Sequence, residues 1–89
     1  MKLTVFGKRG CSACQQAKAK VEYYLAKWQV DIPLEYCDLE TVDGLALGAF
    51  HDVVEIPTVL LEAAGRELRR WVRFPPRSDE LYELVMGRG

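Results

Sequence analysis

The feature that most constrains the fold is a β-strand pattern followed at once by a long helical pattern. The stretch "KLTVF" (2–6) is β-branched and aromatic and stops at Gly7, which predicts a buried strand. Pro33 cannot continue a helix, so we expect a helix over about 12–28 and a strand over "PLEYCDL" (33–39). A strand–helix–strand unit implies a parallel pair joined by a right-handed crossover. The helix is expected because apolar residues recur at helical spacing, at Cys14, Ala17, Val21, Tyr24, Leu25 and Trp28.

The middle of the chain predicts a short helix and a β-hairpin. Asp43 and Gly44 open a helix over "LALGAFHDV" (45–53). Strands are expected over "TVLLEA" (58–63) and "LRRWV" (68–72), because "AAGRE" between them makes a tight turn.

A last helix is expected after the chain is broken by Pro75 and Pro76. Ser78 can cap this helix, and Gly87 stands at its end. The predicted order is βαβαββα, an α/β fold with a four-stranded mixed sheet flanked by three helices. We expect one domain over residues 1–89, since this length suits a single compact unit.

Composition and charge exclude several classes of function. The formal net charge is −1 and 49% of the residues are apolar, so no overall basic field attracts nucleic acid or an anionic membrane. Three cysteines are too few for a secreted disulfide framework. The N-terminus lacks a signal-peptide pattern, and the longest apolar stretch, "VVEIPTVLL", is interrupted by Glu55 and Pro57. We therefore expect a cytoplasmic, monomeric protein with no nucleic-acid or membrane partner.

The stretch "FGKRGCSACQQAK" (6–18) carries the candidate chemistry. Cys11 stands where the first strand ends and the helix begins, close to unpaired backbone N–H groups at the positive end of the helix. These donors, with Lys8 and Arg9 nearby, favour the thiolate, which makes Cys11 the expected nucleophile. Cys14 lies one turn deeper on the same face and is expected to resolve a mixed disulfide.

A zinc site and a permanent disulfide are the alternatives for this pair. A structural zinc ion needs four ligands, and the further candidates, Cys37 and His51, each stand alone. Cys37 is better explained as a packed small hydrophobe, and His51 as a surface residue or a partner of a helix C-terminus. A C-x-x-C beside a βαβ pattern in a cytosolic chain is typical of a redox motif. We therefore expect no metal site and a reversible Cys11–Cys14 disulfide.

With these elements the chain resembles the glutaredoxin branch of the thioredoxin superfamily over nearly its full length. The resemblance rests on "FGKRGCSACQQAK", "EIPTV", the hairpin "AAGRELRRWV" and the terminal "SDELYELV". It implies that Pro57 is cis and faces the dithiol, and that Ile56 offers its backbone N–H and C=O to an extended substrate. It also implies that Lys8 supports the thiolate. Thioredoxins carry a tryptophan at the place of Gly10 and an acid at the place of Val5, and both are absent here.

The departures from the glutaredoxin pattern concern glutathione. Ser12 and Ala13 replace the usual Pro-Tyr, and Pro75 and Pro76 stand where a Gly-Gly pair would help to hold glutathione. Proline has no N–H and fixes φ, so the substitutions weigh against glutathione. The segment "RWVRFPP" is instead partly similar to the glutaredoxin-like hydrogen donors of ribonucleotide reductase, which are reduced by thioredoxin reductase. That match lacks the glycine expected at Arg73.

The functional expectation is a dithiol thiol–disulfide oxidoreductase that reduces protein or small-molecule disulfides without a bound cofactor. The alternative is a glutathione-dependent or iron–sulfur-cluster-binding glutaredoxin that acts as a carrier module. The expected partners are disulfide-containing proteins and a reductase, with the thioredoxin reductase type favoured over glutathione. Four aromatic residues are expected to pack inside the fold, namely Tyr23, Tyr24, Trp28 and Trp71. The arginines around "RELRR" are expected to protect an edge strand.

Overall fold

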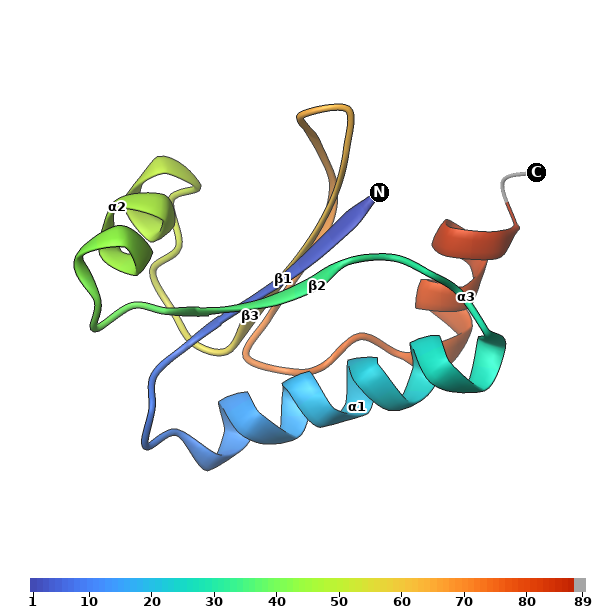
Figure 1. Cartoon of the computed structure of the whole chain (residues 1–89), viewed down its shortest axis with the longest axis horizontal. Coiled ribbons are helices and arrows are strands. Elements are labelled where there is room, and N and C mark those ends of the chain that lie inside the picture. Colours follow the sequence, from blue (N-terminus) through green and yellow to red (C-terminus); the bar gives the residue numbers. More distant parts are fainter. Residues whose placement is uncertain (88–89) are drawn as a thin grey trace.

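A computed structural model describes residues 1–87 of the chain; residues 88 and 89, which the expected domain includes, lie outside the described part. The predicted order βαβαββα is confirmed. The elements, shown in Figure 1, are β1 (Lys2–Gly7), α1 (Ser12–Trp28), β2 (Leu34–Asp38), α2 (Val42–Phe50), β3 (Thr58–Ala63), β4 (Arg66–Val72) and α3 (Ser78–Met86).

The four strands form one mixed sheet in the order β2-β1-β3-β4. β1 pairs with β2 in parallel, with Val5 opposite Tyr36, as the strand–helix–strand unit predicted. β1 also pairs antiparallel with β3, and β3 pairs antiparallel with β4 to form the predicted hairpin. β4 is therefore an edge strand, as its arginines indicated.

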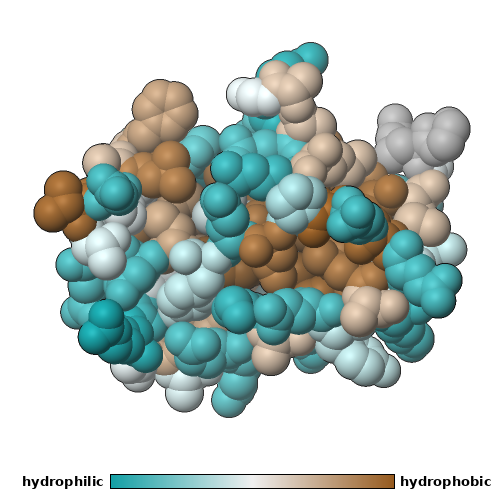
Figure 2. All heavy atoms as spheres, in the orientation of Figure 1, coloured by the Kyte–Doolittle hydropathy of each residue, from teal (hydrophilic) through white to brown (hydrophobic). Residues whose placement is uncertain are grey.

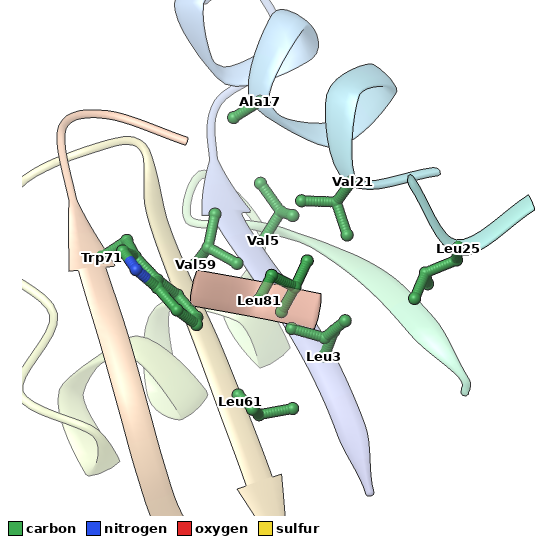
Figure 3. Packing of buried hydrophobic residues seen from close by; sticks show 9 residues of the cluster. All are labelled: Leu3, Val5, Ala17, Val21, Leu25, Val59, Leu61, Trp71 and Leu81. Carbon is green, nitrogen blue, oxygen red and sulfur yellow. The ribbon is translucent and has the colours of Figure 1, made fainter. Parts of the chain in front are cut away.

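Alternate residues of the central strands supply the two halves of the core. Leu3, Val5, Val59 and Leu61 point to the face covered by α1 and α3, where Leu81 is also fully buried (Figure 3). A smaller cluster on the other face contains Phe6, Cys37 and Leu60, with Leu39, Leu47 and Val53 packed against it. The helices thus lie on both sides of the sheet, with α1 and α3 on one side and α2 on the other (Figure 1).

The main differences from the predicted elements lie at α2, β4 and the start of α3, while β1 and β2 differ by no more than one residue at either end. α2 spans Val42–Phe50 rather than 45–53, because Thr41 caps its first turn by accepting a hydrogen bond from the N–H of Gly44 at 3.0 Å. β4 begins at residue 66 rather than 68, because the hairpin turn has only two residues. Ser78 is the first residue of α3 and Arg77 occupies the cap position, so the expected serine cap is wrong.

The expected aromatic packing is confirmed except at one position. Tyr24 stacks on Trp28 at 5.3 Å between ring centroids, and Trp28 meets Tyr82 edge-on at 5.1 Å. Trp71 packs against α3 and donates its indole N–H to Glu80 at 2.8 Å. Tyr23 is 61% exposed, because it lies about 100° around the helix from Tyr24.

No helix within residues 1–87 combines the length and the apolar composition that a membrane span needs.

The hairpin turn provides a test of the fold. Ala64 and Gly65 both have positive φ, 54° and 74°, in a two-residue turn of the type that favours Asn-Gly. Ala64→Asn should raise the free energy of unfolding by about 0.5 kcal/mol, because asparagine tolerates this region better than alanine. Gly65→Ala should lower it by about 1 kcal/mol. Urea denaturation measures both, and a destabilising Ala64→Asn would contradict the described turn.

Candidate active site

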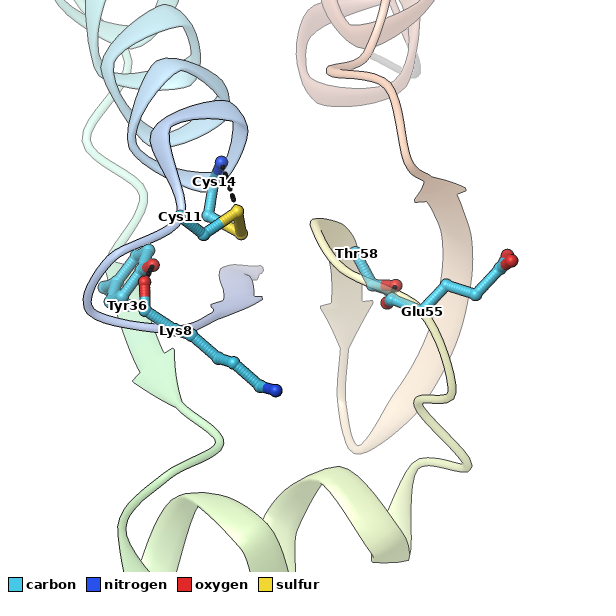
Figure 4. Close-up of a disulfide and its surroundings, with 6 residues drawn as sticks. All are labelled: Lys8, Cys11, Cys14, Tyr36, Glu55 and Thr58. Atoms are coloured by element: carbon cyan, nitrogen blue, oxygen red, sulfur yellow. Dashed lines mark hydrogen bonds between the residues drawn. A yellow bond between two sulfur atoms is a disulfide. The ribbon is translucent and has the colours of Figure 1, made fainter.

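Cys11 and Cys14 lie at the junction between β1 and α1 and form a disulfide (Figure 4). Their Cα atoms are 5.2 Å apart. Cys11 is the N-cap residue of α1, and its sulfur accepts a hydrogen bond from the backbone N–H of Cys14 at 3.1 Å. When the pair is reduced, the same N–H and the positive end of the 17-residue helix would stabilise a thiolate on Cys11.

The two cysteines differ in their access to solvent. Cys11 is half-buried, whereas Cys14 is 0% exposed. A disulfide on another molecule can therefore reach the sulfur of Cys11 but not that of Cys14. This difference supports the predicted order, in which Cys11 attacks first.

Lys8 lies beside the pair, but its side chain is directed away from the sulfur atoms (Figure 4). Lys8 and Arg9 are both exposed, and neither forms an ion pair within residues 1–87. The donors nearest to Cys11 are thus those of the helix backbone. The role of Lys8 stays a prediction.

Gly7, the last residue of β1, lies directly against Cys14. A Cβ atom at this position would stand 2.6 Å from the Cβ of Cys14 and 2.5 Å from the hydroxyl oxygen of Tyr36. Real Cβ atoms do not approach other atoms so closely, so only glycine lets the strand end pass beneath the first turn of α1. In the sequence, Gly7 indicated only the end of a strand.

Tyr36 on β2 fixes the loop that precedes Cys11. Its hydroxyl donates a hydrogen bond of 2.8 Å to the carbonyl oxygen of Lys8, and the N–H of Cys11 donates to the same oxygen at 3.3 Å. Burial raises the pKa of Tyr36 above its ordinary value of 10.0, and the charge of Asp38 adds to this effect. The hydroxyl is therefore protonated at neutral pH and acts as a donor. No pattern in the sequence predicts this contact, because it joins residues 28 positions apart.

The segment before β3 lies at the same end of the sheet. Thr58 pairs with Phe6 at the end of β1, so the peptide Ile56–Pro57, which is cis as the resemblance implied, adjoins the β1–α1 junction. Figure 4 shows Glu55 and Thr58 across from the disulfide. Pro57 is buried and its carbonyl accepts from the N–H of Arg73 at 2.6 Å. Within residues 1–87 the backbone N–H and C=O of Ile56 have no hydrogen-bond partner. Substrate binding by Ile56 and Pro57 stays a prediction.

Cys37 is a packed small side chain, as predicted. It is 8% exposed, and its thiol points to the carbonyl of Gly44 at 3.7 Å. Burial raises the pKa of this thiol, with smaller contributions from Glu35 and Asp38, so it is a poor nucleophile at neutral pH. His51 ends α2 and meets Phe6 edge-on. In the described part of the chain, no three His, Cys, Asp or Glu residues gather as a metal site.

The segment between β4 and α3 differs in detail from the expected pattern. Arg73, where the resemblance expects glycine, has a φ of 75°, the region that favours glycine. Its side chain pairs with Glu55 at 3.1 Å. Pro76 is fully buried, and Phe74 is 72% exposed. Together with α1 this segment forms a groove of about 630 Å³ beside the disulfide, lined by Ala13, Gln16, Ala19, Lys20, Tyr23, Arg73, Phe74 and Pro75.

Four arginines of the basic segment are paired with nearby acids. Arg69 pairs with Glu80, Arg70 with Glu67, Arg73 with Glu55 and Arg77 with Asp79. This edge of the sheet is therefore charged but largely neutralised.

This architecture, with a C-x-x-C disulfide at the start of the first helix, is that of a thioredoxin-like protein. Similar solved structures include thioredoxin 1 from the thermophilic eubacterium Thermosipho africanus TCF52B, with a TM-score of 0.73, 22% identity, and coverage of 99% of this chain and 100% of that one. A mutant thioredoxin from Halobacterium salinarum NRC-1 has a TM-score of 0.74 and 28% identity, and the match covers 96% of this chain and 71% of that one. An uncharacterized thioredoxin-like protein from Clostridium perfringens gives a TM-score of 0.79 and 17% identity, with coverage of 99% and 70%.

No family model matches the sequence, and neither does any curated protein. The predicted thioredoxin-like fold is confirmed by the structural neighbours. This fold, with two C-x-x-C cysteines at disulfide distance, supports a thiol–disulfide oxidoreductase. Assignment to the glutaredoxin branch stays a prediction.

Tyr36→Phe tests how the loop before Cys11 is held. The change removes the hydrogen bond to the carbonyl of Lys8, so the free energy of unfolding should fall by about 1 kcal/mol. Alkylation of reduced Cys11 should also become several-fold slower, because the loop no longer holds Cys11 at the helix N-terminus. Urea denaturation and iodoacetamide kinetics measure the two effects.

Tyr23→Phe is the matched control for this variant, since the hydroxyl of Tyr23 is on an exposed side chain of α1. It should leave both stability and alkylation unchanged. Equal behaviour of the two variants would show that the Tyr36 hydrogen bond does not position Cys11.

Proposed function

We propose that this protein is a dithiol oxidoreductase that reduces disulfides of proteins or small molecules in the cytoplasm. One observation carries the proposal: a half-buried sulfur caps a helix N-terminus, while its partner sulfur is fully buried one turn behind it. A structural disulfide needs no such difference in access. A reversible pair needs one sulfur to meet the substrate and another to be protected from it.

The reaction consists of two thiol–disulfide exchanges. The thiolate of Cys11 attacks one sulfur of the substrate disulfide, forming a mixed disulfide and releasing the other substrate sulfur as a thiolate. The thiolate of Cys14 then attacks the sulfur of Cys11, which releases the second substrate thiolate and leaves the Cys11–Cys14 disulfide. Two electrons pass from the protein to the substrate, and solvent protons neutralise the released thiolates. A separate reductase must restore the dithiol.

The segment around Ile56 is the proposed binding site for the substrate chain. Its backbone N–H and C=O have no partner within residues 1–87, and it adjoins the end of β1 that leads to Cys11. An extended peptide could pair with these groups as an added strand. Pro57 would shape this surface, and Lys8 would attract a carboxylate on the substrate.

A thioredoxin reductase type of partner is the proposed reductant. Glutathione would need backbone donors between β4 and α3, where Pro75 and Pro76 provide none. The iron–sulfur carrier alternative depends on glutathione as a co-ligand, so the same prolines argue against it. We propose that the protein acts as a monomer and holds no cofactor.

Substitution of each cysteine should give different products. Cys11→Ser should abolish turnover, because the accessible attacking sulfur is gone. Cys14→Ser should accumulate a mixed disulfide with the substrate, because the resolving sulfur is gone. Mass spectrometry of each variant after mixing with a disulfide-bonded peptide distinguishes them.

Cys37→Ala is the control for both variants, since this thiol is buried away from the pair and its pKa is raised. It should keep full activity and form no adduct. An adduct on Cys11→Ser but none on Cys14→Ser would reverse the assigned roles.

The reductant is tested by rate measurements with two sources of electrons. Each missing charge-assisted hydrogen bond to glutathione costs about 1.5–3 kcal/mol, so two of them weaken binding by about two to four powers of ten. The oxidised protein should therefore be reduced slowly by glutathione and faster by NADPH with a thioredoxin reductase.

A Pro75→Gly, Pro76→Gly double variant should gain glutathione turnover relative to the parent protein. Because Pro76 is fully buried, its unfolding curve must be measured at the same time. A parent protein that turns over briskly with millimolar glutathione, and a folded variant that gains nothing, would refute the argument.

A further inference from the structure

The outer face of α2 carries an unpartnered row of apolar side chains. The row follows helical spacing. It consists of five exposed residues, Val42, Leu45, Ala46, Ala49 and Phe50. We call these five residues the α2 stripe. Val42 is 85%, Leu45 63% and Phe50 79% exposed, and Val54 beyond the helix is 90% exposed. Figure 2 shows apolar side chains over α2, at the upper left.

The opposite face of α2 explains why this row lies on the outside. Gly44 and Gly48 are buried, one turn apart. A Cβ at Gly44 would overlap the carbonyl oxygen of Asp38, and one at Gly48 would lie 2.6 Å from the Cδ2 of Leu39. The backbone at Gly44 leaves no room for a side chain beneath the helix. The glycine face of α2 therefore lies against the end of β2, and Leu45 and Phe50 lie on the outer side. The exposure of the α2 stripe is built into the packing.

Contiguous exposed apolar side chains are a feature of surfaces that contact other molecules. We propose that the α2 stripe is the docking site for a partner protein whose apolar surface is bordered by lysine and arginine. The charges around the stripe define this partner. Between Trp28 and Gly65 the sequence has eight Asp or Glu residues and no Lys or Arg. Exposed acids lie next to the stripe along the chain, at Glu40, Asp43 and Asp52.

A second copy of the chain fits this surface poorly. Two α2 stripes facing each other would bring Asp43 and Asp52 of one copy against the same acids of the other, and like charges across an interface are unfavourable. Arg70 contacts the end of α2 but is not free to compensate, because it is bound to Glu67 and to the carbonyl of His51. A basic border on a different protein meets the acids with opposite charge.

The α2 stripe also leads to the redox pair. Val54 and Glu55 follow the helix and run directly into the Ile56–Pro57 segment. Figure 4 shows α2 on the side of the site toward which the Lys8 side chain extends. A partner on the stripe would therefore lie at the end of the sheet that also carries Cys11, since Gly7 and Asp38 pair there. The docking inference itself does not rest on the proposed function, because binding can be measured without turnover.

The test uses two synthetic helical peptides that share one leucine-rich face. One peptide has lysine on both sides of that face and the other has glutamate. Each is labelled with fluorescein and titrated with the whole oxidised chain, and amide shifts of the ¹⁵N-labelled chain locate the contact. The lysine peptide should bind about tenfold or more tightly than the glutamate peptide. The shifted amides should be those of α2 and Val54.

Variants separate docking from general charge attraction. Leu45→Ala and Phe50→Ala should each weaken the lysine peptide about tenfold, because they remove anchors at the centre and end of the stripe. The control variants are Phe74→Ala and Tyr23→Ala, which change exposed aromatic residues outside α2. They should bind the lysine peptide as tightly as the parent chain does. All four positions are exposed, and the amide spectrum reports whether each variant is folded.

Three results would overturn the proposal. One is equal binding of the two peptides. Another is parent-like binding by folded Leu45→Ala and Phe50→Ala, or shifts confined to the groove beside Phe74. The third is a concentration-dependent dimer of the parent chain in sedimentation that Phe50→Ala dissolves, which would make the stripe a contact between copies.

Discussion

The close approach of β1 to the first turn of α1 is the constraint on which the rest of the site depends. It exists because Gly7 has no side chain, so the strand end passes directly beneath Cys14. This contact buries Cys14 fully and leaves Cys11 at the helix start, where backbone N–H groups are unpaired. The asymmetry between the two sulfurs follows from the packing of the strand end, and needs no charged neighbour to create it.

The hydrogen bonds around Gly7 extend this constraint to the next strand. The carbonyl of Gly7 accepts from the N–H of Leu39 at 2.8 Å, and Tyr36 holds the carbonyl of Lys8 from the same strand. The end of β2 therefore supports the loop that leads to Cys11. The loop is thus held by the sheet on one side and by the helix on the other.

The sequence predicted the elements well wherever a periodic pattern contrasts with its surroundings. The positions of β1 and α1 were predicted well. The β-branched residues of β1 stop at Gly7, and the apolar residues of α1 recur at helical spacing among polar residues. α2 was misplaced, because its residues are apolar on almost every side and give no periodic contrast. Asp43 indicated the region of its start, but the exact first residue depends on the cap at Thr41.

The two cysteines were found from the sequence because their spacing and position carry the chemistry. Tyr36 was missed because its contact with the loop depends on the parallel register of β1 and β2, which brings Val5 opposite Tyr36. Tyr23 was misjudged because two adjacent tyrosines on a helix differ by about 100° in direction, and the pattern alone does not decide which one faces the core. Such contacts depend on how elements meet, which local patterns do not specify.

The same glycine-based packing also determines how a docked partner would be presented to the dithiol. Thr41 caps α2, and its N–H and hydroxyl both donate to the carbonyl of Asp38 at the end of β2. Gly44 then rests on that same carbonyl. No flexible linker therefore separates α2 from the strand that supports the Cys11 loop. A partner bound on the α2 stripe would be held in a fixed orientation to Cys11, which raises the effective concentration of its disulfide at the attacking sulfur. In this arrangement specificity comes from α2, while the chemistry at the helix N-terminus can stay the same for every substrate.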